Sequence, residues 1–352
     1  MSAETGSSKT PTVIAIGDLH GYYPALKRLL EAIDRHYRIF SPENPDRLIP
    51  GVTLVFTGDY IDRGDSALEI IERLRRLQAE NPRRVITLFG NHELIALEAY
   101  DVARDLAKKA GSQSATRALE EYGARTIHGH PGNGGQHFIL EFGSSARAAL
   151  KDYVERMSRN GDVGRWMRGL FPYYEARIGK RRVLFVHADL SEELLRPGVL
   201  ERYKEGLLEI LRTSTEDMGG TAKKYGHDWL MMSAGIFWCR SFLKLKDAST
   251  ATIKGICRRA GVDLIVTGHT PRPPRIVPYG GRIFDIDVGM SDAFWSRPDH
   301  ENVPWALLLW RNGRVAGFSA NGEEQEFRAK GEGSDDKPKG QLAFFVEVRE
   351  KS

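Results

Sequence analysis

The chain has 352 residues, of which 41% are hydrophobic and 28% are charged. This balance is ordinary for a soluble globular protein and excludes disorder of the whole chain, and the length allows one large domain or two small ones. The formal net charge is +4, with a pI near 8.9. Such a mild excess suits an anionic substrate, but the basic residues form no stripe of the kind that nucleic-acid binding needs.

The rest of the composition points to a reducing compartment. Cys239 and Cys257 are the only cysteines, so a disulfide framework is not indicated. Residues 1–11 are rich in serine and threonine, lack the features of a signal peptide, and are expected to be flexible. No apolar run approaches the roughly 20 residues that a membrane span requires. We therefore expect a cytoplasmic protein with neither nucleic-acid nor membrane partners.

Three short apolar runs in the first hundred residues each end in a polar cluster that contains glycine. These are Val13–Ile16 before Gly17–Gly21, Thr53–Phe56 before Gly58–Gly64, and Val85–Phe89 before Gly90–Glu93. Short, partly β-branched runs bounded by glycine are typical of buried strands.

Helical patterns separate these strands. Pro24–His36 repeats leucine and isoleucine at helical spacing, and Ser66 is positioned to cap a second helix. Alternating strands and helices predict an α/β sheet, and sheets of this type bind ligands beyond the carboxyl ends of their strands. The three polar clusters are therefore expected to meet at one edge.

The middle of the chain, around residues 100–180, is predicted to be a helical insertion. After it, Val183–Val186 ends in His187, and Leu264–Thr267 precedes His269. Later strands are expected near residues 282–286, 306–310 and 315–319, in an antiparallel arrangement. We expect one domain over residues 12–320, followed over 321–352 by a mobile segment and a terminal strand near 341–348.

The five strand ends supply six residues of metal-ligand type. They are Asp18, His20, Asp59, Asn91, His187 and His269. A lone aspartate or histidine in a loop is usually only solvated or hydrogen-bonded, but five such clusters are hard to attribute to coincidence. The mixed oxygen and nitrogen set, without thiolate, suits manganese, iron or zinc better than calcium. Six ligands suit two ions that share a carboxylate, and Asp59, central in the chain order, is the natural bridge.

The three glycine-bounded clusters also carry a family resemblance. Gly17-Asp-Leu-His-Gly21, Gly58-Asp-Tyr-Ile-Asp-Arg-Gly64 and Gly90-Asn-His-Glu93 resemble the three motifs of the phosphoprotein phosphatase family, within the calcineurin-like metallophosphoesterases. The resemblance covers roughly Val13 to Gly289. It implies an α/β fold in which a calcineurin-like β-sandwich is flanked by helices. The stretch Gly235–Arg240 is similar to the bacterial-type, Shewanella-like branch.

The resemblance also implies a role for each site residue. The first metal ion would be held by Asp18, His20 and Asp59, and the second by Asp59, Asn91, His187 and His269. His92 would be the general acid, oriented by Asp62. Phosphate oxygens would be bound by Arg63, Arg240 and Asn91. An imidazolium backed by a carboxylate can donate a proton near neutral pH, and a guanidinium fork matches a phosphate.

One position departs from the family pattern. Members usually have two glycines after the histidine that matches His187, whereas this chain has Ala188-Asp189. The extra carboxylate at the edge of the site could alter substrate choice or orient a ligand histidine.

The function implied is hydrolysis of phosphate monoesters by direct attack of a hydroxide that bridges two divalent ions, with manganese expected. The expected partners are phosphorylated proteins or peptides carrying phosphoserine or phosphothreonine, with phosphotyrosine as a further candidate. Two alternatives remain open. A dinucleoside polyphosphate hydrolase has similar metal motifs but often lacks an aspartate at the position of Asp62, and an inactive phospho-binding module would usually have lost a ligand.

Overall fold

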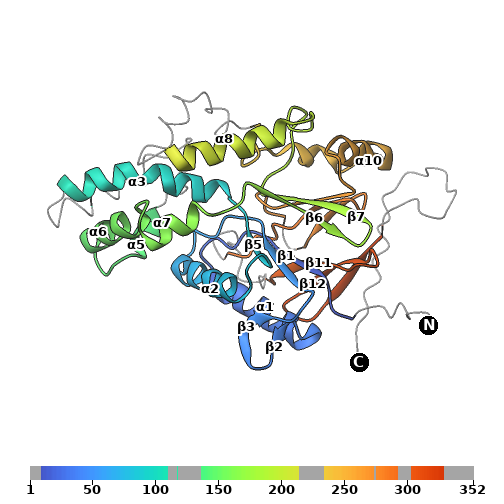
Figure 1. Cartoon of the computed structure of the whole chain (residues 1–352), viewed down its shortest axis with the longest axis horizontal. Helices are drawn as coiled ribbons and strands as arrows, with labels where there is room; N and C mark the ends of the chain where they lie inside the picture. Colours follow the sequence, from blue (N-terminus) through green and yellow to red (C-terminus); the bar gives the residue numbers. More distant parts are fainter. Residues whose placement is uncertain are drawn as a thin grey trace.

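The computed structural model describes residues 9–109, 117, 136–213, 234–272, 275–291 and 303–328. Two β-sheets form a sandwich with helices on its outside (Figure 1). The rings of Phe284 in one sheet and Phe327 in the other lie 5.5 Å apart, and buried residues of both sheets belong to one continuous hydrophobic core. The predicted α/β class and helix-flanked sandwich are confirmed.

The first sheet has the strand order β13-β12-β11-β1-β4-β5. Its strands are β1 (Val13–Ile16), β4 (Thr53–Phe56), β5 (Val85–Thr87), β11 (Trp305–Leu309), β12 (Val315–Ser319) and β13 (Glu324–Phe327). Strands β1, β4 and β5 run parallel, whereas β11 pairs antiparallel with β1 and with β12. The three predicted N-terminal strands therefore end at the same edge, as expected for a parallel arrangement.

The second sheet has the order β6-β7-β8-β10-β9. Its strands are β6 (Tyr173–Ile178), β7 (Arg181–Val186), β8 (Leu264–Thr267), β9 (Val277–Tyr279) and β10 (Ile283–Asp285). Strands β7, β8 and β10 are parallel to one another. The predicted antiparallel arrangement is correct for β11 and β12 but wrong for the pairing of β10 with β8. The chain reverses first through β9, which pairs antiparallel with β10.

Two N-terminal helices cover the first sheet, beside the small hairpin of β2 (Phe40–Ser41) and β3 (Asn44–Leu48). Helix α1 (Tyr23–Tyr37) buries the leucines and isoleucine of its predicted apolar face. Helix α2 (Ala67–Glu80) begins after Ser66, as predicted, but the Ser66 hydroxyl donates to the Gly21 carbonyl at 3.0 Å instead of capping the helix. Ser66 thus ties α2 to the first polar loop.

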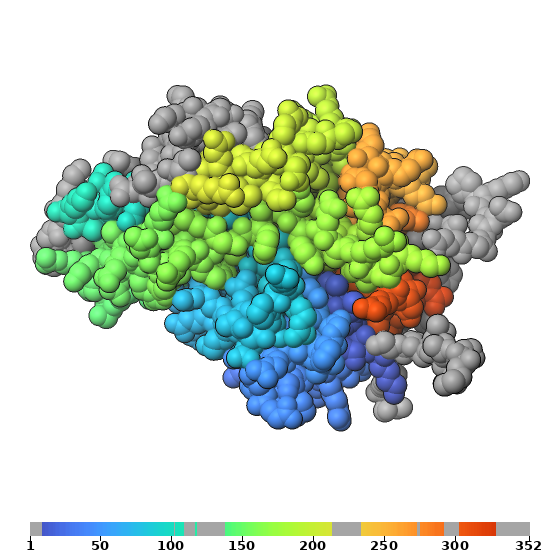
Figure 2. Space-filling view, in the orientation of Figure 1, coloured from blue at the N-terminus to red at the C-terminus, as the bar shows by residue number. Residues whose placement is uncertain are grey.

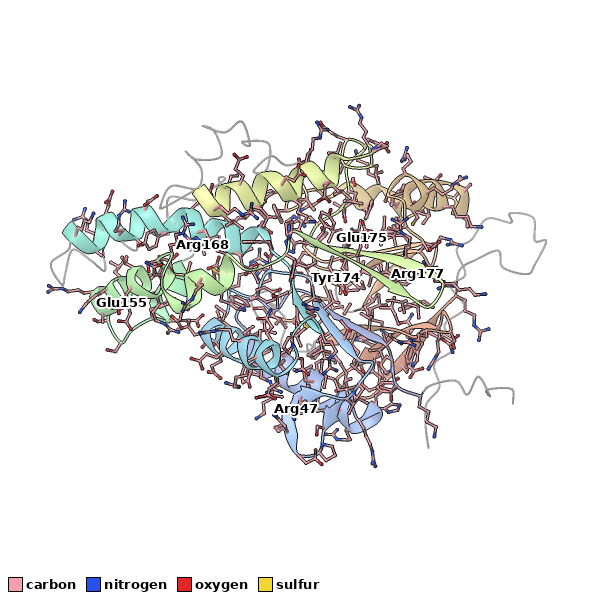
Figure 3. All side chains as sticks on the ribbon, in the orientation of Figure 1. Arg47, Glu155, Arg168, Tyr174, Glu175 and Arg177 are labelled. Atoms are coloured by element: carbon pink, nitrogen blue, oxygen red, sulfur yellow. The ribbon has the colours of Figure 1, made fainter. Side chains whose placement is uncertain are left out.

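The predicted helical insertion is present among the described residues. It contains α3 (Asn91–Lys109), α5 (Gln136–Leu140), α6 (Ala146–Met157) and α7 (Asp162–Met167). Helix α6 packs on α3, and the group extends to one side of the molecule (Figures 1 and 2). The predicted end near residue 180 is wrong, because β6 pairs with β7 along six residues. Glu155 lies among the helices, whereas Tyr174, Glu175 and Arg177 lie on β6 (Figure 3).

The other helices in the described part of the chain are α8 (Val199–Thr213), the 3-10 helix η3 (Ser241–Leu245) and α10 (Thr250–Arg259). In the described ranges, no helix combines the length and the apolar character that crossing a bilayer would require. The prediction of a mobile segment from residue 321 is wrong for its first residues, because β13 lies there. Residues Glu324–Phe327 pair antiparallel with β12, and charged side chains suit such an edge strand. The predicted strand near 341–348 lies outside the described residues.

A carboxylate ties the helical insertion to α2. Asp162, at the start of α7, accepts from Arg75 at 2.8 Å and from Arg156 through two bonds of 3.0 Å. The hydrogen bond from Arg156, opposed by partial burial, lowers the pKa of Asp162 from 3.8 to about 2. Its stabilising effect is therefore complete above about pH 4 and is lost as the pH falls through about 2.

We expect Asp162→Asn to lower the free energy of unfolding by about 0.5–1 kcal/mol between pH 5 and 7, because the group is partly exposed. The difference from wild type should shrink below pH 4. Urea unfolding at pH 7, 5, 4 and 3 measures this, with Asp247→Asn on the surface as the control. A difference that stays constant down to pH 3 would contradict the assignment.

Candidate metal centre

The loops that follow β1 and β4 are bonded to each other through their backbones. The amide of His20 donates to the Asp59 carbonyl at 2.9 Å, and the amide of Gly64 donates to the His20 carbonyl at 3.0 Å. Gly64 approaches Gly21 so closely that a Cβ at position 64 would lie 2.4 Å from the Gly21 carbonyl oxygen. The glycines of the first two motifs therefore permit the contact that brings Asp18, His20 and Asp59 together.

The Asp59 carboxylate is held at the start of helix α3. Its Oδ1 accepts from the His92 amide at 3.0 Å, where the helix dipole favours negative charge. Glu93 fixes the surrounding backbone, because its carboxylate accepts from the amides of Asp59, Tyr60 and Gly90 at 2.8–2.9 Å. The sequence places Glu93 in the third motif, but no role was predicted for it. The feature that could have indicated this role is a glutamate in the first turn of a helix that follows a strand.

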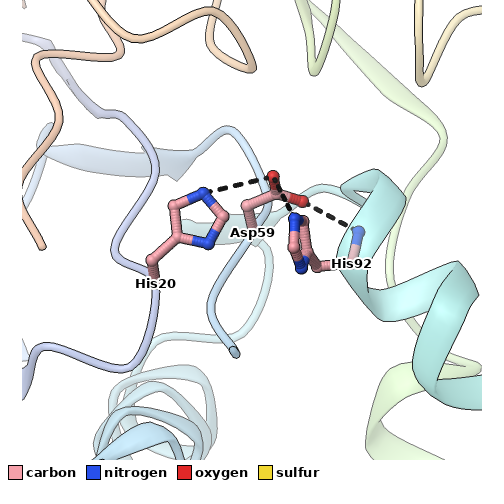
Figure 4. Close-up of side chains that lie close together, drawn as sticks. All are labelled: His20, Asp59 and His92. Atoms are coloured by element: carbon pink, nitrogen blue, oxygen red, sulfur yellow. Dashed lines mark hydrogen bonds and ion pairs between the residues drawn. The ribbon is translucent and has the colours of Figure 1, made fainter. Parts of the chain in front are cut away.

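Three histidines surround this carboxylate. His20 Nε2 lies 3.5 Å from Asp59 Oδ2, His187 Nε2 lies 3.5 Å from Oδ1, and His92 Nε2 lies 4.0 Å from Oδ2. Figure 4 shows His20 and His92 on either side of Asp59. Potential ligand atoms lie within 4.8 Å of one another in two groups, His20–Asp59–His92 and Asp59–His187–His269. Asp59 belongs to both, as expected for a bridging residue.

The second sheet contributes to this cluster through His187 and His269. His187 Nδ1 lies 2.8 Å from the Thr57 carbonyl and can donate to it, which leaves Nε2 with a lone pair. That Nε2 faces Asn91 Oδ1 at 3.0 Å, and His269 Nδ1 approaches the same oxygen at 2.9 Å. Lone pairs that face one another at such distances match a cation.

Asp18 completes the set. Its Oδ2 accepts from the His269 amide at 2.9 Å. Asp18 Oδ1 is buried and has no hydrogen-bond partner within the described part of the chain. A buried carboxylate oxygen without a partner is costly, and a cation would satisfy it. The donor set and this oxygen therefore fit divalent ions, and the six predicted ligand residues do lie together.

Burial and mutual contacts set the charges of the group. Burial, helped by Arg63 and His92, lowers the pKa of His20, and burial likewise lowers the pKa of His187 and His269. Burial alone would raise the pKa of Asp59, but the adjacent imidazoles hold it below its usual range. Neutral imidazoles around an ionised carboxylate are the protonation states that metal binding requires.

His92 differs from the other histidines. Its Nδ1 lies 2.8 Å from Asp62 Oδ2. Burial opposes protonation, but the carboxylates of Asp59 and Asp62 outweigh it and raise the pKa of His92. Arg63 lies beside it, with guanidinium nitrogens 3.4 Å from His92 Nε2 and 3.1 Å from His20 Nε2. The structure thus brings together an imidazole of raised pKa, its carboxylate and an arginine.

The other predicted arginine lies at the edge of the cluster. Arg240 is exposed, and its Nη1 donates to the Thr270 hydroxyl at 3.0 Å, next to His269. Trp238 packs its ring edge-on to His269 at 6.3 Å. Burial is the main cause of the lowered pKa of His187 and His269, and the charge of Arg240 adds to it for both, so this charge reaches the second group of ligands.

Sequence reasoning missed two buried carboxylates, Asp285 and Asp287. Strand β10 is parallel to β8, so its end delivers both residues to the same edge as His269. Burial raises the pKa of Asp287 to about 7, with Asp59 adding to the effect and Arg63 and Arg240 opposing it. The sequence feature that could have predicted these two carboxylates is Asp285-Ile-Asp-Val-Gly289, a polar cluster with glycine that follows an apolar run.

Backbone conformation marks the same site. Seven non-glycine residues of the described chain have positive φ, and five of them belong to the polar loops. The five are His20, Asp59, Asp62, Arg63 and His269. Such conformations cost about 1–3 kcal/mol each and persist where the surroundings enforce them, most often at functional sites.

A sandwich with paired Asp/His clusters at the strand ends defines a metallophosphoesterase-type protein. The sequence matches the model of the calcineurin-like phosphoesterase family over residues 11–273. The chain belongs to this family. The expected resemblance is confirmed, and the family implies divalent metal ions.

Curated relatives are similar over part of the chain. The serine/threonine-protein phosphatase BSL2 of Arabidopsis thaliana is 34% identical over 105 residues, which are 28% of this chain and 10% of that protein. The serine/threonine-protein phosphatase 6 catalytic subunit of Drosophila melanogaster is 33% identical over 84 residues, 24% of this chain and 23% of the relative. The matched region thus spans less than a quarter of either relative.

Solved structures show the same fold over most of the chain. A cold-active protein tyrosine phosphatase superposes with a TM-score of 0.61 and 20% identity, covering 90% of this chain and 78% of its own. The cold-active protein-tyrosine phosphatase of a psychrophilic Shewanella species gives 0.57 and 18% identity, covering 90% and 80%. At this identity the likeness concerns the fold alone.

The close approach of Gly90 to Asp59 gives a test of the site. A Cβ at position 90 would lie 2.1 Å from Asp59 Oδ1 and 2.4 Å from the Asp59 amide. Gly90→Ala must therefore displace the carboxylate, and we expect it to weaken Mn²⁺ binding about 10–100-fold. Isothermal titration with Mn²⁺ measures this. Gly255→Ala is the control, because a Cβ there meets nothing within 4 Å, and equal affinities in the two variants would contradict the site.

Proposed function

We propose that this protein is a metal-dependent phosphatase that hydrolyses phosphate monoesters in proteins, chiefly phosphoserine and phosphothreonine. The observation that carries the proposal is the arrangement around Asp59. Five further residues of ligand type gather around it, and the His92–Asp62 pair and two arginines lie at the same edge. Metal ligands, a proton donor and phosphate-binding cations are the parts that phosphoryl transfer to water requires.

The ligand assignment keeps Asp59 as the residue shared by the two groups and otherwise follows the family resemblance. Asp18, His20 and Asp59 would hold one divalent ion, and Asp59, Asn91, His187 and His269 would hold the other. Bound ions of this kind stabilise charge on phosphoryl oxygens and lower the pKa of a water molecule toward neutrality. The oxygen and nitrogen donors, without thiolate, favour manganese, with iron or zinc as substitutes.

His92 is proposed to supply the proton for the departing oxygen. Its Nδ1–H donates to Asp62, so the ring is fixed with Nε2 directed toward the Asp59 carboxylate. The raised pKa favours a proton on this ring, which distinguishes His92 from the three histidines of lowered pKa. A general acid in this position typically contributes 10²–10⁴-fold to the rate.

Arg63 and Arg240 are proposed to bind the phosphate oxygens. Arg63 already lies against His20 and His92, and Arg240 is tied to Thr270 beside His269. The two guanidinium groups therefore border both ligand groups, and each can bind two oxygens of a phosphate. The Asn91 amide is proposed as a further contact to the same phosphate.

The choice of protein substrates is supported by Asp62 and by the relatives. Dinucleoside polyphosphate hydrolases often lack this aspartate, whereas here it holds His92 at 2.8 Å. Both curated relatives carry the name of serine/threonine phosphatases, and the superposed structures carry the name of tyrosine phosphatases. Phosphotyrosine is therefore the comparison substrate.

The general-acid role is tested by His92→Asn. We expect this variant to keep its metal content, because His92 is outside the proposed ligand set. Its kcat should fall about 10²–10³-fold on a phosphoserine peptide and much less on p-nitrophenyl phosphate, whose leaving group needs no proton. His36→Asn on helix α1 is the control. An equal loss on both substrates would exclude the general-acid role.

The substrate class is tested with metal-free protein reloaded with Mn²⁺. We expect phosphate release from phosphoserine and phosphothreonine peptides, less from phosphotyrosine peptide, and little from diadenosine tetraphosphate. Asp59→Asn should abolish both Mn²⁺ binding and turnover, since it removes the shared ligand. Preference for the dinucleotide would move the protein to that class, and inactivity on every substrate despite bound metal would refute the proposal.

A further inference from the structure

Asp189 is a buried carboxylate that the proposed mechanism does not use. It lies two residues after His187, and its side chain is nearly inaccessible, at 2% exposure. Its Oδ2 accepts from the Phe242 amide at 2.7 Å, and its own amide donates to the Cys239 carbonyl at 3.0 Å. These two bonds hold the chain immediately before Arg240 and two residues after it.

Two further bonds join the same pair of loops. The Ala188 amide donates to the Ile236 carbonyl at 3.2 Å, and the Ser241 hydroxyl donates to the Leu190 carbonyl at 2.9 Å. The segment after β7 is thus bonded along its length to residues 236–242. Within this set, the Phe242–Asp189 bond alone uses a side-chain acceptor, and removing that acceptor would leave the buried Phe242 amide without its partner, which is costly.

The sequence suggested that Asp189 could alter substrate choice or orient a ligand histidine, and the contacts of His187 exclude the second role for that histidine. A carboxylate that orients a ligand histidine must bond one of its ring nitrogens. The two nitrogens of His187 instead lie against the Thr57 carbonyl and Asn91 Oδ1, at 2.8 and 3.0 Å. Asp189 directs its bonded oxygen to the Arg240 loop instead.

Arg240 needs such support because its side chain is exposed. A long exposed arginine loses considerable rotamer freedom when it binds a phosphate. Among the described residues, the guanidinium is anchored at the Thr270 hydroxyl. The backbone beneath it is fixed by Asp189, which is covalently continuous with His187. Asp189 therefore connects the backbone on both sides of Arg240 to the loop that carries His187.

We propose that Asp189 is a positioning residue for phosphate binding, which holds the loop that presents Arg240 to the substrate. This inference rests on the proposed function, in which Arg240 binds the phosphate. Asp189 touches neither the substrate nor the metal ions. Its effect passes through Arg240, and so it should vanish when the guanidinium is absent.

The test is a double-mutant cycle on protein loaded with Mn²⁺, read out by the Kd for inorganic phosphate in isothermal titration. Asp189→Ala should weaken phosphate binding about tenfold. In the Arg240→Ala background, the same change should alter the Kd less than twofold. Asp189→Asn should restore binding to within about threefold of wild type, because its amide oxygen can still accept from Phe242. The same pattern is expected in kcat/KM on a phosphoserine peptide.

Asp34→Ala is the matched control. Asp34 also accepts from a backbone amide, that of Phe40 at 2.9 Å, but it lies on helix α1 away from the cluster. It should leave the phosphate Kd unchanged. Mn²⁺ stoichiometry is measured for every variant, and Asp189→Ala should keep the wild-type value.

Three results would overturn the inference. They are an equal effect of Asp189→Ala with and without Arg240, loss of Mn²⁺ in Asp189→Ala, and absence of phosphate binding in the wild type. The proposed function is judged separately by wild-type turnover of the peptides. Suppose that the phosphate Kd values follow the predicted double-mutant cycle but the wild-type protein releases no phosphate from peptides. The role of Asp189 in phosphate binding would then stand, and the phosphatase assignment would be refuted.

Discussion

A single buried negative charge organises the centre of this molecule. The pKa of Asp59 is held below its usual range although burial opposes this, because imidazoles surround the carboxylate. The amide at the start of α3 also donates to it. A buried carboxylate without such partners would be neutral. The Glu93 carboxylate accepts from amides of two loops, those of Asp59 and Tyr60 after β4 and that of Gly90 after β5. It therefore holds these two loops together around the Asp59 side chain.

The need to hold ligand side chains around the Asp59 carboxylate explains why strained backbone conformations are concentrated in the surrounding loops. Five polar residues take left-handed backbone conformations that the sheet and the loop-to-loop hydrogen bonds enforce. Without strands on both sides, these loops would relax and the ligands would separate. The sandwich therefore acts as the support for a geometry that the loops could not maintain alone.

Much of this could be read from the sequence, since glycine-bounded strand ends predict both the sheet and the edge where Asp18, Asp59 and Asn91 meet. The rest depended on pairing between distant segments. Whether β10 lies parallel or antiparallel to β8 is invisible in the local pattern, and this choice alone decides that Asp285 and Asp287 join the site. Likewise, the composition of residues 324–327 resembles a loop, and only β12 makes it a strand.

The two proposed ion sites differ in where their ligands originate along the chain. Asp18, His20 and Asp59 all follow strands of the first sheet, whereas the second ion would also need His187 and His269 from the other sheet. During synthesis, the first set is complete once some sixty residues have emerged, by the chain positions of its members. The second must wait for residue 269. An ion held there would link the two sheets across their shared edge, so its binding would report that the sandwich has closed.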